Sequence, residues 1–473
     1  MISSSQFFET YGNENEYIEF KTAAEGIPRD MWETYSSFAN TSGGKIILGV
    51  MENQKAGTFT VTGVNNIEKT KKVLWDNLHN SKYVNKCILE NDDIQVVDVD
   101  DKKIIIVDVP KADITERPIF VFGDIMSGTY KRNSEGDYHC TRDEIMAMIR
   151  DSYTTVSDLE PVMSTDMDSL DMDSFKRYLS TARDYRTEQK WLRMDEDEML
   201  EFLGICRTVD GNRHLTAAGL LMFGKVSAII LRYPKFFLDY RESTGDNRWD
   251  IRIDSNTQAL NVFSFIEETL RRLSTVIGSP FNINGIRHEK VSNTFLSVRE
   301  AVINALIHAD YSNESIRIAI VYDGSKIVIT NPGTMRVPLD RALKGGNSNP
   351  RNQAMMRIAM MGGLVEYVGS GIHFINDTVN DNGLLKFSMI ESGEPLEVKT
   401  TLWLPIRGHD LNNTELAILR YIEDNDNATQ NRIAEAIGVS VRTVNRTMSK
   451  LKNEGILEIG GNNRNPKWTI RKT

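Results

Sequence analysis

Three polar side chains recur along one apolar stretch, and their types and spacing are the most suited to chemistry in this chain. The stretch REAVINALIHADYS covers residues 299–312, and Glu300, Asn304 and His308 recur in it at every fourth position. In a helix, this spacing places all three side chains on one face. Buried polar groups need polar partners, so such a face is expected to meet either a polar ligand or water. The residues that follow favour the ligand.

Two strands and two glycine-containing loops follow this helix in the sequence. Residues 316–322 and 326–330 are apolar, strand-like runs, and Asp323-Gly324 between them predicts a hairpin turn. The chain continues through Asn331-Pro332-Gly333, and Gly369-Ser370-Gly371 later opens another predicted helix. Free backbone N–H groups at a helix start are a common seat for phosphate. The order therefore predicts a phosphate-bearing ligand beside the helix that carries Glu300.

This order resembles the ATP site of the GHKL family (the Bergerat fold), in which a helix with the pattern E-x-x-x-N precedes two glycine-containing loops. The resemblance implies that Glu300 is the base that activates a water and that Asn304 is a Mg²⁺ ligand. Asn331 stands where the family has an adenine-binding aspartate, so ATP binding is expected with at most weak hydrolysis. The pattern Asn-Pro-Gly is closer to the RecG-type C-terminal ATPase-like domain. The resemblance also implies nucleotide contacts at Gly333, Gly369 and Gly371. His308, Gly345, Gly346 and Ser370 are further candidate nucleotide-binding residues.

The N-terminal part carries a second resemblance. The segments EYIEFK at 16–21 and SSFANTSGGKIILGV at 36–50 are similar to the Schlafen-type AlbA-like domain. Locally, a helix is expected to end at Asn40, with Gly43-Gly44 forming a tight turn into a strand. The resemblance implies nucleic-acid binding, with phosphate contacts at Lys21, Lys45, Lys131 and Arg132.

Some members of that family cleave RNA with three carboxylates around a metal ion. The corresponding residues here are Glu14, Glu19 and Glu52, but Glu52 is displaced and longer than the usual aspartate. Metal-dependent cleavage, for example in antiviral defence, is therefore the alternative hypothesis, and binding without cleavage is favoured.

The C-terminal residues have the pattern of a winged helix-turn-helix. Amphipathic helices are predicted at 414–425, 428–438 and 440–455, with Thr429 and Ser440 as N-caps, and two strands at 456–470. Residues 411–473 hold ten Lys or Arg against seven Asp or Glu, whereas the whole chain has a net charge of −10. This favours DNA over the alternative, a winged helix used for protein contacts. The predicted DNA contacts are Arg442, Thr443, Asn445, Arg446, Lys450, Arg464 and Lys467.

The expected fold class is α+β multidomain. Residues 1–153 form an AlbA-like α/β domain and residues 154–175 an Asp- and Ser-rich linker. A Bergerat-type α/β sandwich with a helical lead-in covers 176–408, and the winged helix covers 409–473.

Composition excludes several classes of protein. With 40% hydrophobic and 26% charged residues the chain has an ordinary globular composition, and no apolar run approaches the roughly 20 residues of a membrane span. A secretory signal is absent, and Cys87, Cys140 and Cys206 are isolated, so we expect a cytoplasmic protein with free thiols. The P-loop pattern G-x-x-x-x-G-K-[ST] is missing, which argues against helicase motor chemistry.

The leading hypothesis is a DNA-binding regulator gated by ATP and Mg²⁺, acting as a homodimer on DNA, with RNA as the alternative nucleic acid. Residues 344–349 would form a lid over the nucleotide. Besides the nuclease, a scaffold whose nucleotide site only supports the structure remains open.

Overall fold

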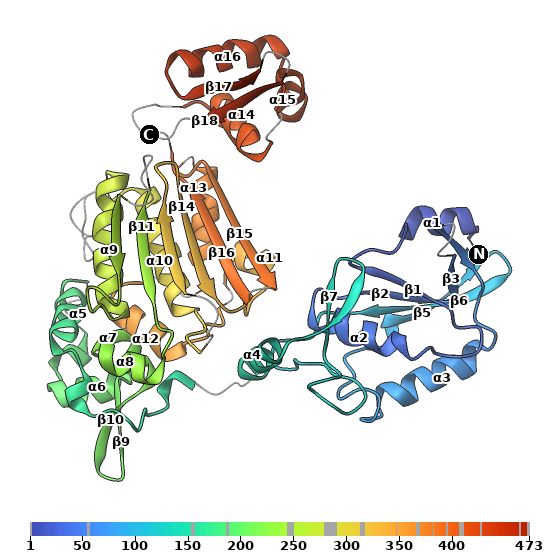
Figure 1. Ribbon diagram of the computed structural model, residues 1–473, viewed down its shortest axis with the longest axis horizontal. Helices are drawn as coiled ribbons and strands as arrows, with labels where there is room; N and C mark the ends of the chain where they lie inside the picture. Colours follow the sequence, from blue (N-terminus) through green and yellow to red (C-terminus); the bar gives the residue numbers. More distant parts are fainter. Residues whose placement is uncertain are drawn as a thin grey trace. The chain divides into compact units, whose positions relative to one another are not determined.

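A computed structural model of the protein divides into two compact units, residues 1–155 and 156–473 (Figure 1). The structure describes residues 2–53, 57–152, 157–185, 189–243, 250–278, 291–312, 317–346, 348–365, 369–381, 383–393, 396–405, 411–425, 428–462 and 465–470.

The first unit is built on a four-stranded sheet in the order β1-β2-β6-β5, with β1 and β2 parallel and the other pairs antiparallel. Successive apolar residues of β6 point to opposite faces, so Ile105 joins the core with α2, and Ile104 and Ile106 pack with Phe7 of α1. As predicted, α2 ends at Asn40 and β2 begins at Gly44. The elements are α1 (Ser4–Tyr11), β1 (Ile18–Lys21), α2 (Asp30–Asn40), β2 (Gly44–Leu48), β3 (Val50–Asn53), β4 (Thr58–Val61), α3 (Ile67–Leu78), η1 (Asn91–Asp93), β5 (Ile94–Val99), β6 (Lys102–Val109), β7 (Tyr130–Asn133), β8 (Gly136–His139) and α4 (Arg142–Ser152).

The second unit opens with short helices and a hairpin. Residues 157–174, which the composition predicts to be linker, pack onto this unit instead. Val162 and Leu170 are buried there, and the Asp158 carboxylate accepts hydrogen bonds from the N–H groups of Ala354 and Met355, at 2.8 and 3.0 Å. The elements are η2 (Ser157–Leu159), η3 (Met167–Ser169), α5 (Met172–Tyr185), η4 (Lys190–Arg193), α6 (Glu196–Leu203), β9 (Cys206–Val209), β10 (Asn212–Leu215), α7 (Ala217–Phe223) and α8 (Val226–Arg232).

A six-stranded sheet in the order β12-β11-β13-β14-β16-β15 follows, and α9, α10 and α13 cover one of its faces (Figure 1). Buried residues alternate along β13, as expected for a sheet with one covered face. The predicted hairpin is present, with Gly324 at φ 94° between β13 and β14. The elements are β11 (Leu238–Glu242), β12 (Ile251–Asp254), α9 (Val262–Ile277), α10 (Asn293–Ile307), β13 (Ile318–Tyr322), β14 (Lys326–Pro332), α11 (Leu339–Lys344), α12 (Gln353–Met361), α13 (Gly371–Asn380), β15 (Lys386–Gly393) and β16 (Leu396–Trp403).

The C-terminal elements form the predicted winged helix-turn-helix. Thr429 and Ser440 cap the second and third helices, and Gly438 ends the second in the left-handed conformation. The elements are α14 (Asn413–Asp424), α15 (Gln430–Ile437), α16 (Val441–Asn453), β17 (Leu457–Asn462) and β18 (Asn465–Ile470).

Two sequence expectations concern the chain as a whole. None of the helices in the described ranges has the length and apolar character needed to cross a membrane. Cys87, Cys140 and Cys206 are not in disulfides, in agreement with their isolated positions in the sequence.

Candidate functional site

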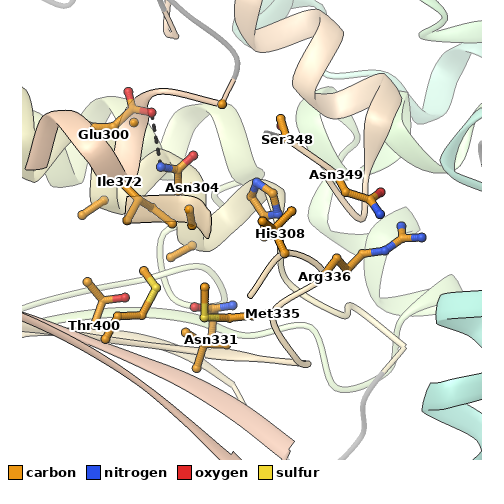
Figure 2. A pocket seen from close by; sticks show the side chains of 18 of the residues that line it. Glu300, Asn304, His308, Asn331, Met335, Arg336, Ser348, Asn349, Ile372 and Thr400 are labelled. Atoms are coloured by element: carbon orange, nitrogen blue, oxygen red, sulfur yellow. Dashed lines mark hydrogen bonds between the residues drawn. The ribbon is translucent and has the colours of Figure 1, made fainter. Parts of the chain in front are cut away.

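A pocket with a volume of about 100 Å³ lies between α10, α13 and the sheet (Figure 2). Glu300, Asn304 and His308 line one wall, and Asn331 and Thr400 of the sheet lie opposite them. The structure thus brings the three residues with four-residue spacing into one cavity.

The carboxylate and the amide of α10 contact each other. Ser292 caps the start of α10 by accepting a hydrogen bond from the Phe295 N–H at 3.2 Å. One turn apart on the helix, the Asn304 side-chain N–H donates to Glu300 Oε1 at 3.2 Å. This leaves the Asn304 side-chain oxygen as an acceptor group that can bind a cation, next to a carboxylate.

His308 lies one residue beyond α10, at its C-cap, and its backbone N–H donates to the Asn304 carbonyl at 2.9 Å. Burial, together with the positive charges of Arg351 and Arg336, lowers the pKa of His308 to about 4. The imidazole is therefore neutral near pH 7 and can both donate and accept a hydrogen bond in the pocket.

This pKa shift predicts a loss of stability on acidification. The unfolded chain binds a proton at His308 near pH 6.5, but the folded chain binds it only near pH 4. The free energy of unfolding therefore decreases as the pH is lowered from about 6.5 to about 4. At about pH 5 the expected loss from this residue is about 2 kcal/mol. Urea unfolding at neutral and acidic pH measures it. The variant His308→Asn, which does not titrate, should lose less stability than the wild type. Equal losses would contradict the shift.

The sheet side of the pocket is formed by β14 and β16. Asn331 pairs with Val398 across the two antiparallel strands, and Thr400 lies two residues further along the same face. The Asn331 side chain is only 5% exposed, and its amide makes no hydrogen bond within the part of the chain that the structure describes. The amide borders the pocket, so a polar ligand atom at this position could exchange hydrogen bonds with it.

Apolar side chains fill much of the remaining wall. Met335, Ile372 and Met389 belong to the pocket lining, and Met335 lies beside Asn331 (Figure 2). Flat heteroaromatic rings suit such surroundings, because their faces are apolar while their edges carry hydrogen-bonding groups.

Glycines shape the end of the pocket near Glu300. A Cβ added to Gly371, the first residue of α13, would lie 2.0 Å from Glu300 Oε1, so a larger residue would displace this carboxylate. Gly345, Gly346 and Gly369 adopt positive φ angles of 74°, 83° and 83°, and the Gly346 N–H donates to the Gly369 carbonyl at 2.9 Å. The first N–H groups of α13 have no partners within the helix, which suits an anion.

Only some of the residues predicted to bind the nucleotide therefore line the pocket. Glu300, Asn304, His308, Asn331, Gly369 and Gly371 line the pocket, as do Ser348 and Asn349 of the predicted lid. Gly333, Gly345, Gly346 and Ser370 are not among the lining residues. A Cβ on Gly333 would lie 3.0 Å from Arg351 Nη2, and Ser370 is the N-cap residue of α13. The lid residue Asn347 is outside the described ranges.

Arg336 and Thr400 are among the pocket residues that the sequence interpretation missed. Arg336 follows Asn331-Pro332-Gly333 by three positions, which was the available signal, whereas Thr400 depends on strand register, which the sequence does not show.

The carboxylates of the alternative nuclease site have other partners in the first unit. Glu19 accepts hydrogen bonds from Arg132 and Lys21, each at 2.8 Å, so both of its oxygens are engaged. Glu14 accepts the Phe20 N–H at 2.9 Å. Burial raises the pKa of Glu14, and the charges of Glu19 and Glu52 act in the same direction. Among the described residues, no group of three or more His, Cys, Asp or Glu side chains is arranged to hold a metal ion.

The cations predicted to contact phosphate in this unit are also paired. Arg132 binds Asp137 at 3.0 Å as well as Glu19, and its side chain is 2% exposed. Lys21 binds Asp30 and Lys131 binds Glu144, each at 2.8 Å, and Lys45 binds Asp108. A phosphate would have to compete with these carboxylates.

The recognition helix presents its predicted polar face. Arg442, Asn445 and Arg446 of α16 are exposed, whereas Val444 and Met448 point into the core of the winged helix. Thr443 is partly buried, and Lys450 binds Glu415 at 2.6 Å. Arg464 lies outside the described residues, as does the side chain of Lys467.

These features define a class of protein that combines a pocket-bearing α/β sandwich, a winged helix and a separate N-terminal α/β unit. Family models identify the same domains. Residues 14–141 match "Schlafen, AlbA_2", residues 313–400 match "Putative ATP-dependent DNA helicase recG C-terminal", and residues 411–458 match "Winged helix-turn-helix DNA-binding". The predicted domain types are thereby confirmed. Residues 146–239 match the domain of unknown function DUF8451.

The recG-type match starts after α10, so Glu300, Asn304 and His308 join the site through the structure and not through that match. A comparison with curated proteins finds no match.

Solved structures that are similar to this chain include the following two. The DIP2311 protein from Corynebacterium diphtheriae is 16% identical over 96% of this chain and 80% of its own, with a TM-score of 0.41. The N-terminal domain of a "Putative ATP-dependent DNA Helicase RecG-related Protein" from Nitrosomonas europaea is 26% identical. That alignment covers 30% of this chain and 95% of the domain, with a TM-score of 0.23.

Proposed function

We propose that this protein is a DNA-binding regulator whose nucleic-acid contacts are controlled by ATP bound in the pocket. The buried Asn331 amide carries the proposal, because it has no hydrogen-bond partner in the described residues and faces a cavity with a carboxylate–amide pair on the opposite wall. The winged helix, with its exposed Arg442 and Arg446, supplies the DNA-binding function. The predicted homodimer is part of the same proposal and is checked by sedimentation velocity.

The pocket fits the two ends of a nucleotide. Asn331 would bind the edge of the base, with Met335 and Met389 against its faces. The start of α13 and the glycines beside it would bind the phosphates. The side-chain oxygen of Asn304 would bind Mg²⁺, which neutralises phosphate charge when it is bound. Glu300 is the residue that would accept a proton from an attacking water, if the nucleotide is hydrolysed.

The proposal predicts that single amide substitutions weaken nucleotide binding. Asn331→Ala removes the polar contact to the base, and a bond of this kind contributes about 0.5–1.5 kcal/mol, so the Kd for MgATP should rise by about 2- to 13-fold. Asn304→Ala removes the Mg²⁺ ligand and should weaken MgATP more than ATP in EDTA. Isothermal titration of the full chain measures both.

Asn212→Ala is the matched control, since Asn212 is exposed on β10 away from the pocket. Unchanged affinity in both pocket variants would refute nucleotide binding at this position.

We also expect the N-terminal domain to leave nucleic acid intact. Both oxygens of Glu19 are bound by cations of the same domain, which leaves no carboxylate group arranged for a metal ion among the described residues. Labelled RNA and single-stranded DNA incubated with the protein in Mg²⁺ or Mn²⁺ should keep their length. Cleavage that is lost in Glu19→Gln would establish the nuclease alternative instead.

A further inference from the structure

Helix α13 connects the pocket to the winged helix. Its first residues, Gly371 and Ile372, line the pocket, and the carbonyl of Val379 near its other end accepts a hydrogen bond from Arg420 of α14 at 2.8 Å. One helix thus has a pocket at its N-terminus and a side chain of the winged helix at its C-terminus.

Arg420 acts as a cap supplied from outside α13. Its Nε also donates to the Leu385 carbonyl at 2.6 Å, just before β15, so one guanidinium group binds two backbone carbonyls. The last carbonyls of a helix have no partners within it, and the C-terminal end of the helix dipole favours a cation. Burial lowers the pKa of Arg420, which fits a guanidinium group enclosed by backbone.

Other contacts hold α14 on the end of the sheet. The indole N–H of Trp403 donates to Glu423 at 2.6 Å, and Lys386 pairs with Asp424 while its ammonium lies 4.7 Å from the Trp403 ring centre. Leu385, which is 4% exposed, belongs to the hydrophobic core of the winged helix. The first helix of the winged domain therefore shares a packed interface with the domain that holds the pocket.

The same helix also contacts the recognition helix. Leu416 and Leu419 of α14 pack with Val444 and Met448 of α16, and Glu415 binds Lys450 at 2.6 Å. A displacement of α14 must therefore be accommodated by α16, because packed cores do not deform continuously.

Helix α13 is fixed to its neighbours in the pocket domain. Ser297 of α10 donates to Thr378 at 2.8 Å, and His373 hydrogen-bonds the Leu343 carbonyl of α11, also at 2.8 Å, next to the predicted lid. A ligand that contacts Gly371 and Ile372 at the start of α13 therefore acts on a helix whose far end is bound by Arg420.

We propose that Arg420 couples the pocket to the winged helix by capping α13, so that a bound nucleotide changes the position and order of α14 and α16. The inference rests on the proposed nucleotide binding and assigns Arg420 the role of a positioning residue. Neither the nucleotide nor DNA needs to touch Arg420 for this effect.

Hydrogen exchange of the full chain with and without MgATP tests the proposal. In the wild type, MgATP should slow exchange in residues 413–424 and 441–453 by about 5-fold or more, the lower end of typical coupling between sites. Arg420→Ala should bind MgATP with nearly unchanged affinity and lose this slowing. Arg420→Lys keeps the charge but can bind only one carbonyl well, so it should retain part of the slowing and guards against misfolding of the alanine variant.

Arg432→Ala, an exposed arginine of α15, is the matched control and should behave like the wild type. If MgATP binds the wild type without slowing exchange in these helices, or if both Arg420 variants keep the full effect, the coupling is refuted and nucleotide binding stands. Absence of MgATP binding in the wild type would refute both.

Discussion

Replacing Arg132 by alanine is expected to destabilise the N-terminal unit by about 3–5 kcal/mol, the usual cost of removing one partner from a buried ion pair. The Arg132 guanidinium group binds Glu19 at 2.8 Å, Asp137 at 3.0 Å and the Asn15 carbonyl at 2.9 Å. Without it, two carboxylates with side chains only 12% and 13% exposed lose a charge partner. Urea unfolding followed by hydrogen exchange of residues 57–152 reports on this unit separately.

Two further variants make this result specific. Arg142→Ala removes an exposed arginine of the same unit and should change stability by less than about 0.5 kcal/mol. Combining Arg132→Ala with Glu19→Gln should cost less than the sum of the single changes, because the second change removes the unpaired charge. If Arg132→Ala instead weakens nucleic-acid binding at unchanged stability, the predicted phosphate contact is correct and the structural role is wrong.

The parts of the fold that depend on local chemistry could be predicted from the sequence. The helix ends of the winged helix follow from the sequence. Thr429 and Ser440 each begin a helix by capping nearby backbone N–H groups, and Gly438 ends one by adopting the left-handed conformation. The polar row on α10 was predicted for the same reason, since Glu300 and Asn304 are one turn apart in any helix.

Features that depend on distant partners could not be predicted. Lys21 and Arg132 resemble phosphate contacts in the sequence, yet their carboxylate partners Asp30 and Glu19 are 9 and 113 residues away. The stretch 157–174 has the composition of a linker, but Asp158 caps a helix that begins 195 positions later, at Gln353. Thr400 reaches the pocket only through strand register. In each case tertiary structure decides the role of a residue whose type alone allows several.

Replacing both Arg442 and Arg446 by alanine is expected to give the largest loss of DNA binding. Both side chains are exposed on α16, on the face opposite Val444 and Met448, where a recognition helix enters the major groove. An arginine that reads a base edge contributes about 1–3 kcal/mol, so the double variant should bind at least about 30-fold more weakly. Fluorescence anisotropy with a sequence selected by the wild type from a random duplex library measures the loss.

The salt dependence of binding then separates the two ways in which these arginines can act. If they contact phosphates, the slope of log K against log salt should fall by about one for each arginine removed, on selected and random duplexes alike. If they read bases, the loss should be concentrated on the selected sequence, with little change in slope. Arg207→Ala, which removes an exposed arginine on β9 outside the winged helix, is the matched control. Unchanged affinity in the double variant would mean that this winged helix serves protein contacts, the alternative that its fold also permits.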